Sequence, residues 1–144
     1  MAESDPIDAI VQLSFAVQGV LTELAAENDL SLTQLRLLGI LRDREPTMLD
    51  LARHLKLEKS SVTGLIDRAV KRGLVERVAA PHDGRATHVR LTASGHELAA
   101  AGTARVQESL SALLAPLPPR DRARLATLAE AVVRASGEGF RDQH

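Results

Sequence analysis

The chain has 144 residues, of which 44% are hydrophobic and 26% charged, so it is long and apolar enough to bury the core of one domain. It contains no cysteine, which excludes disulfides, thiolate zinc sites and cysteine nucleophiles, and its only aromatic residues are Phe15 and Phe140, which disfavours stacking on single-stranded nucleic acid. The formal net charge is −1, but residues 47–92 carry +4 after an acidic start of −5 over residues 1–46. This asymmetry indicates contact with a polyanion, although an uneven solvated surface gives the same pattern.

The start of the chain is acidic and lacks the basic and apolar regions of a secretory signal. No apolar run approaches the roughly 18 residues that cross a bilayer. We therefore expect a soluble, cytoplasmic protein with no membrane partner.

The first two predicted helices span residues 7–27 and about 33–44. The first is apolar on more than one side, so it needs more than one packing partner, and a second subunit is a candidate. The second follows a turn at Asn28–Ser31 and is predicted to have Thr33 as its N-cap. It ends at Glu45-Pro46, because the residue before a proline disfavours the α conformation.

A helix-turn-helix follows. The first of its helices is short, covers Leu49–Leu55 and is capped by Thr47. After a tight turn, the second covers residues 59–72 and stops at Gly73, where a glycine can adopt the left-handed conformation that ends a helix.

Two short β-patterned runs come next, at Leu74–Ala79 and Thr87–Leu91, and an Asp-Gly hairpin signal lies between them. Thr92 is then predicted to cap a long helix over about 93–114. Prolines interrupt the chain, and a last helix covers about 120–135.

The helix at 59–72 has two distinct faces. Its apolar residues recur at i, i+3, i+4 and i+7 and are predicted to be buried: Val62, Leu65, Ile66 and Ala69. The opposite side carries small, hydroxyl and charged residues, which suits the second helix of a helix-turn-helix that enters the major groove of DNA. The predicted DNA-binding residues, with Thr47 and the hairpin tip included, are Thr47, Lys59, Ser60, Ser61, Thr63, Gly64, Asp67, Arg68, Lys71 and Arg85.

Three cations in this set have distinct expected roles. Arg68 can pair bidentately with a guanine, Lys71 lies nearer to phosphates, and Arg85 at the hairpin tip can enter a narrow minor groove. A solvated helix surface is an alternative interpretation of this face. The weak helix formers clustered on its exposed first turn favour a closely approaching ligand instead.

The run from Leu49 to Gly95 contains several spaced motifs: LA-x-x-L, S-V-T-x-L-I-D-R, G-L-V-x-R, P-x-D-x-R and V-x-L-T-x-x-G. With these motifs the chain resembles the multiple antibiotic resistance regulator (MarR) family of bacterial transcription factors. The resemblance implies a mainly α fold, a winged helix-turn-helix with N- and C-terminal dimerisation helices. The implied organisation is a dimerisation helix in 1–30, the DNA-binding domain in 31–92 and two dimerisation helices in 93–144.

The resemblance also implies a function. We expect a homodimer that binds a palindromic operator in double-stranded DNA and acts as a repressor. Arg85 matches the family's minor-groove arginine, and Asp83 matches the acid that steadies the wing through Arg77. A small phenolic or organic acid is expected to modulate DNA affinity. Four residues are candidates for its pocket, with plain core as the alternative: Phe15, Leu35, Leu38 and Val106.

Other function classes have less support in the sequence. A winged helix that binds a protein without DNA specificity is the main alternative, and the basic middle of the chain weighs against it. We find no catalytic motif and expect no enzyme, no cofactor and no metal, because the histidines lack ligand-like spacing.

Overall fold

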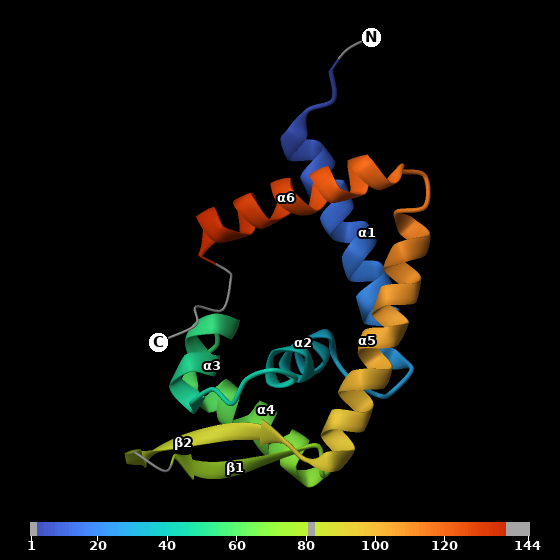
Figure 1. Cartoon of the computed structure of the whole chain (residues 1–144). Helices are drawn as coiled ribbons and strands as arrows, with labels where there is room; N and C mark the ends of the chain where they lie inside the picture. Colours follow the sequence, from blue (N-terminus) through green and yellow to red (C-terminus); the bar gives the residue numbers. More distant parts are fainter. Residues whose placement is uncertain (1–2, 81–82, 138–144) are drawn as a thin grey trace.

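The computed structural model describes residues 3–80 and 83–137, with side chains except at 80 and 83–85, and within them it has six helices and one β-hairpin (Figure 1). The elements are α1 (Pro6–Ala26), α2 (Leu32–Leu41), α3 (Met48–Leu55), α4 (Lys59–Lys71), β1 (Val75–Ala80), β2 (Asp83–Leu91), α5 (Ala93–Leu113) and α6 (Pro119–Ser136). The fold is mostly helical with a two-stranded antiparallel sheet, as predicted for a winged helix-turn-helix.

Side-chain caps fix where several helices begin. Thr47 and Thr92 cap α3 and α5 as predicted, since each hydroxyl accepts a hydrogen bond of 3.0 Å from the backbone N–H three residues further on. The prediction of Thr33 as the cap of α2 is wrong. Ser31 takes that position, because it forms a reciprocal capping box with Gln34, whose side chain accepts a hydrogen bond from the Ser31 backbone N–H at 2.8 Å.

The segment between α2 and α3 is extended and forms an isolated β-bridge with strand β2. The N–H of Val89 donates to the carbonyl of Pro46 at 2.9 Å, and Thr47 forms an antiparallel bridge with His88. This pairing requires extended backbone before α3. Accordingly, α2 ends at Leu41, earlier than the predicted residue 44.

The hairpin has the predicted strands with shifted ends. β1 begins at Val75, one residue late, and β2 begins at Asp83, four residues early. The two strands pair antiparallel, with Val75 opposite Leu91 and Arg77 opposite Val89. As predicted, Val89 and Leu91 share the buried face of β2.

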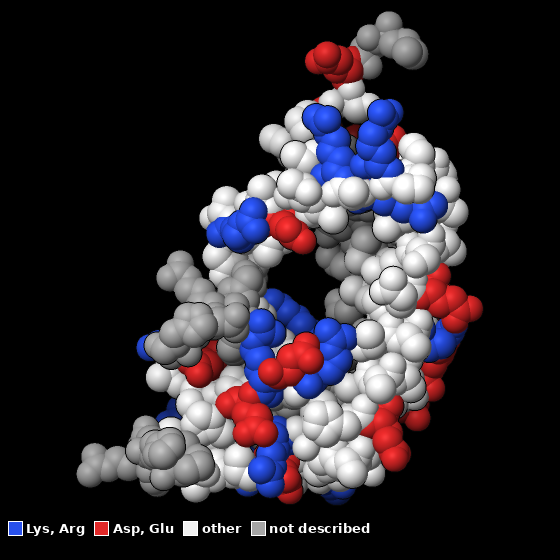
Figure 2. Space-filling view, viewed as in Figure 1, with Lys and Arg blue, Asp and Glu red and all other residues white. Residues whose placement is uncertain are grey.

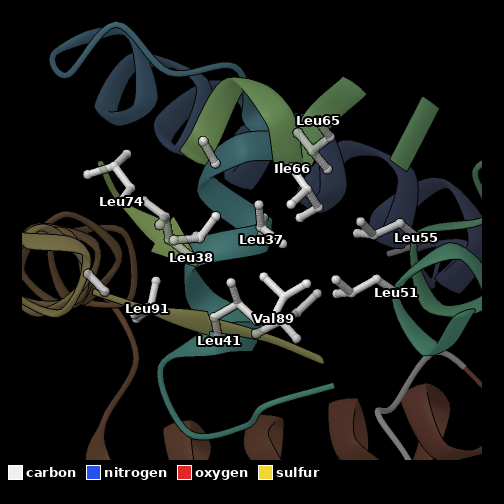
Figure 3. Packing of buried hydrophobic residues seen from close by; sticks show 14 of the residues in the cluster. Leu37, Leu38, Leu41, Leu51, Leu55, Leu65, Ile66, Leu74, Val89 and Leu91 are labelled. Carbon is white, nitrogen blue, oxygen red and sulfur yellow. The ribbon is translucent and has the colours of Figure 1, made fainter. Parts of the chain in front are cut away.

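Most of the hydrophobic core lies in the winged-helix lobe, which we define as residues 32–91, and Ala25, Leu30 and Ala99 join it from outside. Leucines of α2 form its centre, and α3, α4 and β2 close around them (Figure 3). The predicted buried stripe of α4 is confirmed in full, since all four of its apolar residues are buried. The residues of the cluster that are most completely buried are Leu37, Leu51, Val62, Ile66, Val75 and Val89.

The three long helices outside the lobe leave apolar surface uncovered. α1 packs on α5 and α2, and α6 crosses at the far end of the molecule, with no buried residue of its own (Figure 1). Figure 2 shows an opening between α6 and the winged-helix lobe. The exposed large apolar side chains of α1 and α6 are Ile7, Ile10, Val11, Leu13, Phe15, Leu128, Val132 and Val133.

The expectation that no segment could cross a bilayer needs correction. By length and composition alone, α1 is apolar enough to do so, although Asp8 and Glu23 interrupt its apolar residues. An uninterrupted run is therefore a stricter criterion than the mean hydropathy of a whole helix.

Candidate nucleic-acid interface and adjoining pocket

The exposed side of α4 carries the residues that the sequence assigned to DNA. Lys59, Ser60 and Ser61 lie on its first turn, and Asp67, Arg68 and Lys71 follow toward its end; all six are exposed. This side lies opposite the stripe that packs into the core, so α4 is held by one face and presents the other to solvent.

Two hydroxyls of the predicted set already have partners in the backbone. Thr47 is half-buried and its hydroxyl accepts from the N–H of Asp50, as the cap of α3. Thr63 donates to the carbonyl of Lys59 at 2.9 Å, within its own helix. A hydroxyl that donates to the helix still has lone pairs that can accept, so Thr63 presents an acceptor outward.

Gly64 makes room for the side chain of Arg68 on the following turn. A Cβ atom at position 64 would lie 3.3 Å from Arg68 Nη1, closer than most Cβ contacts in proteins. The guanidinium therefore lies back over the bare backbone of Gly64, toward the first turns of α4. This is the part of a recognition helix that faces base edges when it lies in the major groove.

An ion pair joins α4 to the hairpin. Arg77 on β1 donates to Asp67 on α4 at 2.5 Å, with the arginine side chain 35% and the aspartate 60% exposed. Asp67 was predicted only to face DNA, and Arg77 only to support the wing through Asp83. The structure instead pairs these two residues with each other, which links the hairpin to α4.

The hairpin tip carries two further predictions. The roles expected for the Asp83 and Arg85 side chains lie outside the described residues. The backbone of both belongs to β2, so the tip is part of the hairpin.

A pocket of about 750 Å³ lies between α1, α2 and α5. Its apolar wall includes three of the four predicted residues, Leu35, Leu38 and Val106. Phe15 does not line the pocket: it lies on α1 with 67% of its surface exposed. The polar residues of the wall are Glu27, Asn28, Arg36, Arg42, Thr103 and Arg105.

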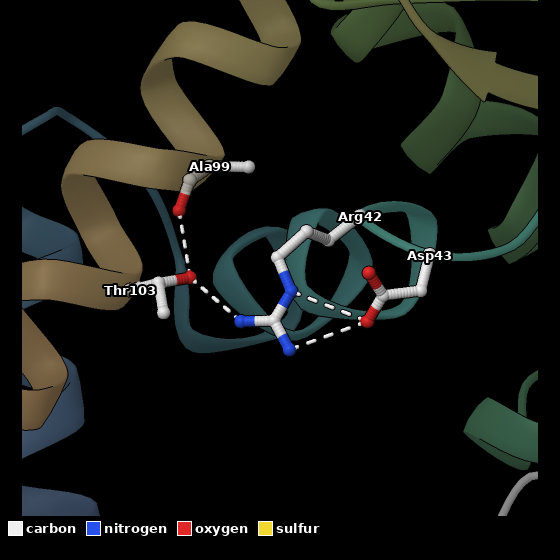
Figure 4. Close-up of polar contacts among 4 residues, drawn as sticks. All are labelled: Arg42, Asp43, Ala99 and Thr103. Atoms are coloured by element: carbon white, nitrogen blue, oxygen red, sulfur yellow. Dashed lines mark hydrogen bonds and ion pairs between the residues drawn. The ribbon is translucent and has the colours of Figure 1, made fainter.

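Two polar contacts connect the walls of this pocket. Arg42 at the end of α2 donates to the Thr103 hydroxyl of α5 at 3.0 Å, and Thr103 donates in turn to the carbonyl of Ala99 (Figure 4). Arg105 of α5 pairs with Glu27, just after α1, at 3.1 Å. The hydrogen bond and charge of Glu27 raise the pKa of Arg105 above its usual value, so this side chain stays cationic.

The sequence analysis missed all six polar residues of this wall, among them Arg42, Thr103 and Arg105. A cation in an exposed helical position has the same sequence signature as a solvated surface, so the sequence contained no signal for them. Among the side chains that the structure describes, no three His, Asp or Glu residues are grouped so as to hold a metal ion.

Comparison with known proteins supports the resemblance stated above. A family model described as MarR family matches residues 28–86, whereas a search of curated proteins finds no match. The apo form of MarR from E. coli is 25% identical, with a TM-score of 0.73 over 91% of this chain and 99% of that one.

Two further solved structures have the same fold. A MepR mutant from S. aureus is 20% identical, with a TM-score of 0.77 over 93% of this chain and 99% of that one. NadR in complex with 4-hydroxyphenylacetate is 23% identical, with a TM-score of 0.75 over 92% and 95% of the two chains.

Proposed function

We propose that this chain is a homodimeric, sequence-specific regulator that binds double-stranded DNA and represses transcription. It matches the MarR family model over residues 28–86 and has the fold of MarR-family winged-helix regulators over nine-tenths of its length. One observation carries the proposal. α4 packs one face into the core and presents cations and hydroxyls on the other, with a glycine where the backbone must approach bases.

The uncovered helices supply the argument for a dimer. α6 has no buried residue, although Leu128, Val132 and Val133 are among its side chains. Apolar side chains presented together in this way mark a contact surface, and α1 presents a second set. We propose that a second copy covers both helices, with residues 1–30 and 93–144 as the dimerisation parts, so that two lobes bind the half-sites of a palindrome.

The pocket supplies the argument for an effector. Its wall combines leucines with three arginines and a single carboxylate, a composition that suits a small organic anion with an apolar body. NadR, which shares the fold, was solved with 4-hydroxyphenylacetate, an acid of this type. An effector of this kind acts only if it favours one spacing of the two lobes over another.

The subcellular localisation follows from the same proposal. A regulator that reads DNA in a bacterium acts in the cytoplasm, without catalysis, and the apolar residues of α1 then contact the partner subunit instead of lipid. Fractionation of cells that express the full chain should place it in the soluble fraction. Recovery with the membranes would contradict this assignment.

Selection of bound duplexes from a random pool tests the proposed function. The full chain should enrich a palindrome and bind it at least about 10³-fold more tightly than random DNA at physiological salt. The same selection in 4-hydroxyphenylacetate tests for an effector of the organic acid class. A pool without an enriched sequence would rule out sequence-specific binding.

A winged helix that binds another protein is the alternative, and salt separates the two. DNA affinity should fall steeply and linearly on a log–log plot against salt concentration. Binding to a protein partner should instead show no steep dependence on salt, and a chain without salt-dependent affinity for DNA would favour this alternative.

A further inference from the structure

Arg72, the residue that ends α4, binds a distant turn through both arms of its guanidinium group. Nη1 donates to the carbonyl of Asp29 at 3.1 Å, and Nη2 donates to the carbonyl of Asn28 at 2.9 Å. These acceptors belong to consecutive residues in the turn between α1 and α2. The planar fork of an arginine suits two neighbouring acceptors, whereas a lysine ammonium offers only a point charge.

The turn itself is held in one shape. Asp29 has a left-handed backbone with φ of 54°, and the N–H of Leu30 donates to the carbonyl of the buried Ala25 at 2.9 Å. The Asn28 N–H donates to the same carbonyl at 3.0 Å. The two carbonyls bound by Arg72 therefore keep fixed positions. The guanidinium also lies near the carboxyl-terminal ends of α1 and α4, where the helix dipoles favour a cation.

The same turn forms part of the pocket wall. Asn28, whose carbonyl Arg72 binds, lines the pocket, and so does Glu27, whose carboxylate pairs with Arg105 of α5. The short segment Glu27–Leu30 thus contacts the pocket on one side and the end of the recognition helix on the other. Anything that moves this segment moves the acceptors of Arg72.

We propose that Arg72 is a positioning residue that couples the pocket-lining turn Glu27–Leu30 to the orientation of α4 on DNA. This inference rests on the proposed function. The sequence suggested phosphate contact for this part of α4, and the two roles differ in a measurable way. A phosphate contact contributes to the salt dependence of binding, whereas a positioning residue contributes to discrimination between sequences.

Affinity measurements with the duplex enriched by selection test the positioning role. Arg72→Gln should raise the dissociation constant for this duplex about tenfold, change that for random DNA less than about twofold, and leave the salt slope unaltered. The matched control is the neighbouring Lys71→Gln, which should weaken binding to both DNAs and reduce the salt slope by about 1. A reduced salt slope in Arg72→Gln would overturn the inference in favour of phosphate contact.

Amide hydrogen exchange tests the coupling without any effector, because coupling between two sites is reciprocal. In the wild-type protein, the enriched duplex should slow exchange at Asn28, Asp29 and Leu30. In Arg72→Gln this slowing should vanish while protection within α4 remains. If Arg72→Gln does not fold, Arg72→Lys is measured in its place, and we expect it to lose most of the slowing.

The outcomes separate this inference from the function on which it rests. A wild-type protein that enriches no duplex overturns both. A wild-type protein that binds its duplex specifically, without slower exchange at Asn28–Leu30, overturns only the role of Arg72. Slowing that persists in the variant has the same consequence.

Discussion

Gly64 and Arg68 depend on each other within one turn of α4. The arginine reaches the first turns of the helix only because no side chain stands at position 64, where a Cβ would lie 3.3 Å from its Nη1. Glycine is a poor choice for the stability of a helix. Gly64 lowers the stability of the helix but leaves space for the guanidinium of Arg68, which suits a role in binding.

Replacement of Gly64 by alanine should therefore change stability and binding in opposite directions. Gly64→Ala should stabilise the fold by about 0.5–1 kcal/mol, because the displaced group is the flexible end of a side chain. It should weaken operator binding by about 1 kcal/mol, or about fivefold in Kd. Thermal melting and DNA titration measure the two effects. Gly102→Ala on α5 is the control, since it should stabilise the fold without loss of DNA binding. Equal DNA binding by both variants would contradict the proposed placement of the Arg68 guanidinium over Gly64.

Arg68 and Lys71 should differ in the kind of affinity that they supply. Arg68→Ala should remove about 1–3 kcal/mol from operator binding and much less from binding to random DNA, because a bidentate contact to guanine is specific to sequence. Lys71→Ala should weaken both and flatten the salt dependence. Parallel titrations at several salt concentrations distinguish the two patterns, and identical patterns would mean that neither residue reads a base.

The junction between the hairpin and α5 is a close backbone contact. A Cβ at Gly95 would lie 2.0 Å from the carbonyl oxygen of Leu74. The Thr92 hydroxyl donates to the carbonyl of Gly73 at 2.6 Å, and the Thr92 N–H donates to that of Leu74 at 3.0 Å. The first turn of α5 is thereby joined to the base of the hairpin, so the two elements move together.

Gly95→Ala should break this junction. Neither backbone can yield without disrupting the hydrogen bonds around Thr92, so we expect a loss of about 3 kcal/mol in the free energy of unfolding. Denaturant unfolding measures it. Gly102→Ala lies on the same helix with 4.0 Å to its nearest neighbour, Leu35 Cδ1, and should be neutral or stabilising. A Gly95→Ala protein as stable as this control would show that the contact relaxes easily.

Features that depend on local periodicity were predictable from the sequence. The buried stripe of α4 follows from a helix that packs against its own chain, and the caps Thr47 and Thr92 follow from hydroxyls placed just before apolar patterns. Ser31 was missed because Thr33 lies close by, and only the partnership with Gln34 decides between the two hydroxyls.

Features that depend on the packing of distant segments were not predictable. The pair of Asp67 and Arg77 requires a particular placement of β1 against α4. The pocket requires the angles among α1, α2 and α5, which is why Phe15 was assigned to it and Arg42 was not. The DNA contacts of α4, like the roles of Asp83 and Arg85 at the hairpin tip, stay predictions.

The molecule as a whole carries most of its exposed large apolar side chains on α1 and α6, outside the winged-helix lobe that holds the proposed DNA-binding surface. Most of the core lies in the winged-helix lobe, with Ala25, Leu30 and Ala99 joining it from outside, while α1 and α6 carry large exposed apolar side chains and α6 lies at the other end (Figure 1). One copy thus leaves surface that a second copy can bury.

A charge on α6 should separate the subunits. Val132→Glu places a carboxylate among the exposed apolar residues of this helix and should weaken dimerisation by about 3 kcal/mol, or about 100-fold. Helix content should persist because the lobe has its own core. Analytical ultracentrifugation measures the change, and Thr127→Glu, on the opposite side of α6, is the matched control. A Val132→Glu protein that remains dimeric would place the subunit contact elsewhere.

The described residues that line the pocket come from α1, α2, α5 and the turn after α1. In the proposed dimer this pocket occurs twice, once beside each winged-helix lobe. DNA bound by both lobes dissociates only when its contacts with the lobes are lost. Its release can therefore depend on effector binding in both pockets. If release requires both pockets to be filled, the response at low effector rises with the square of the effector concentration, and DNA release becomes a steeper function of concentration than binding to one pocket.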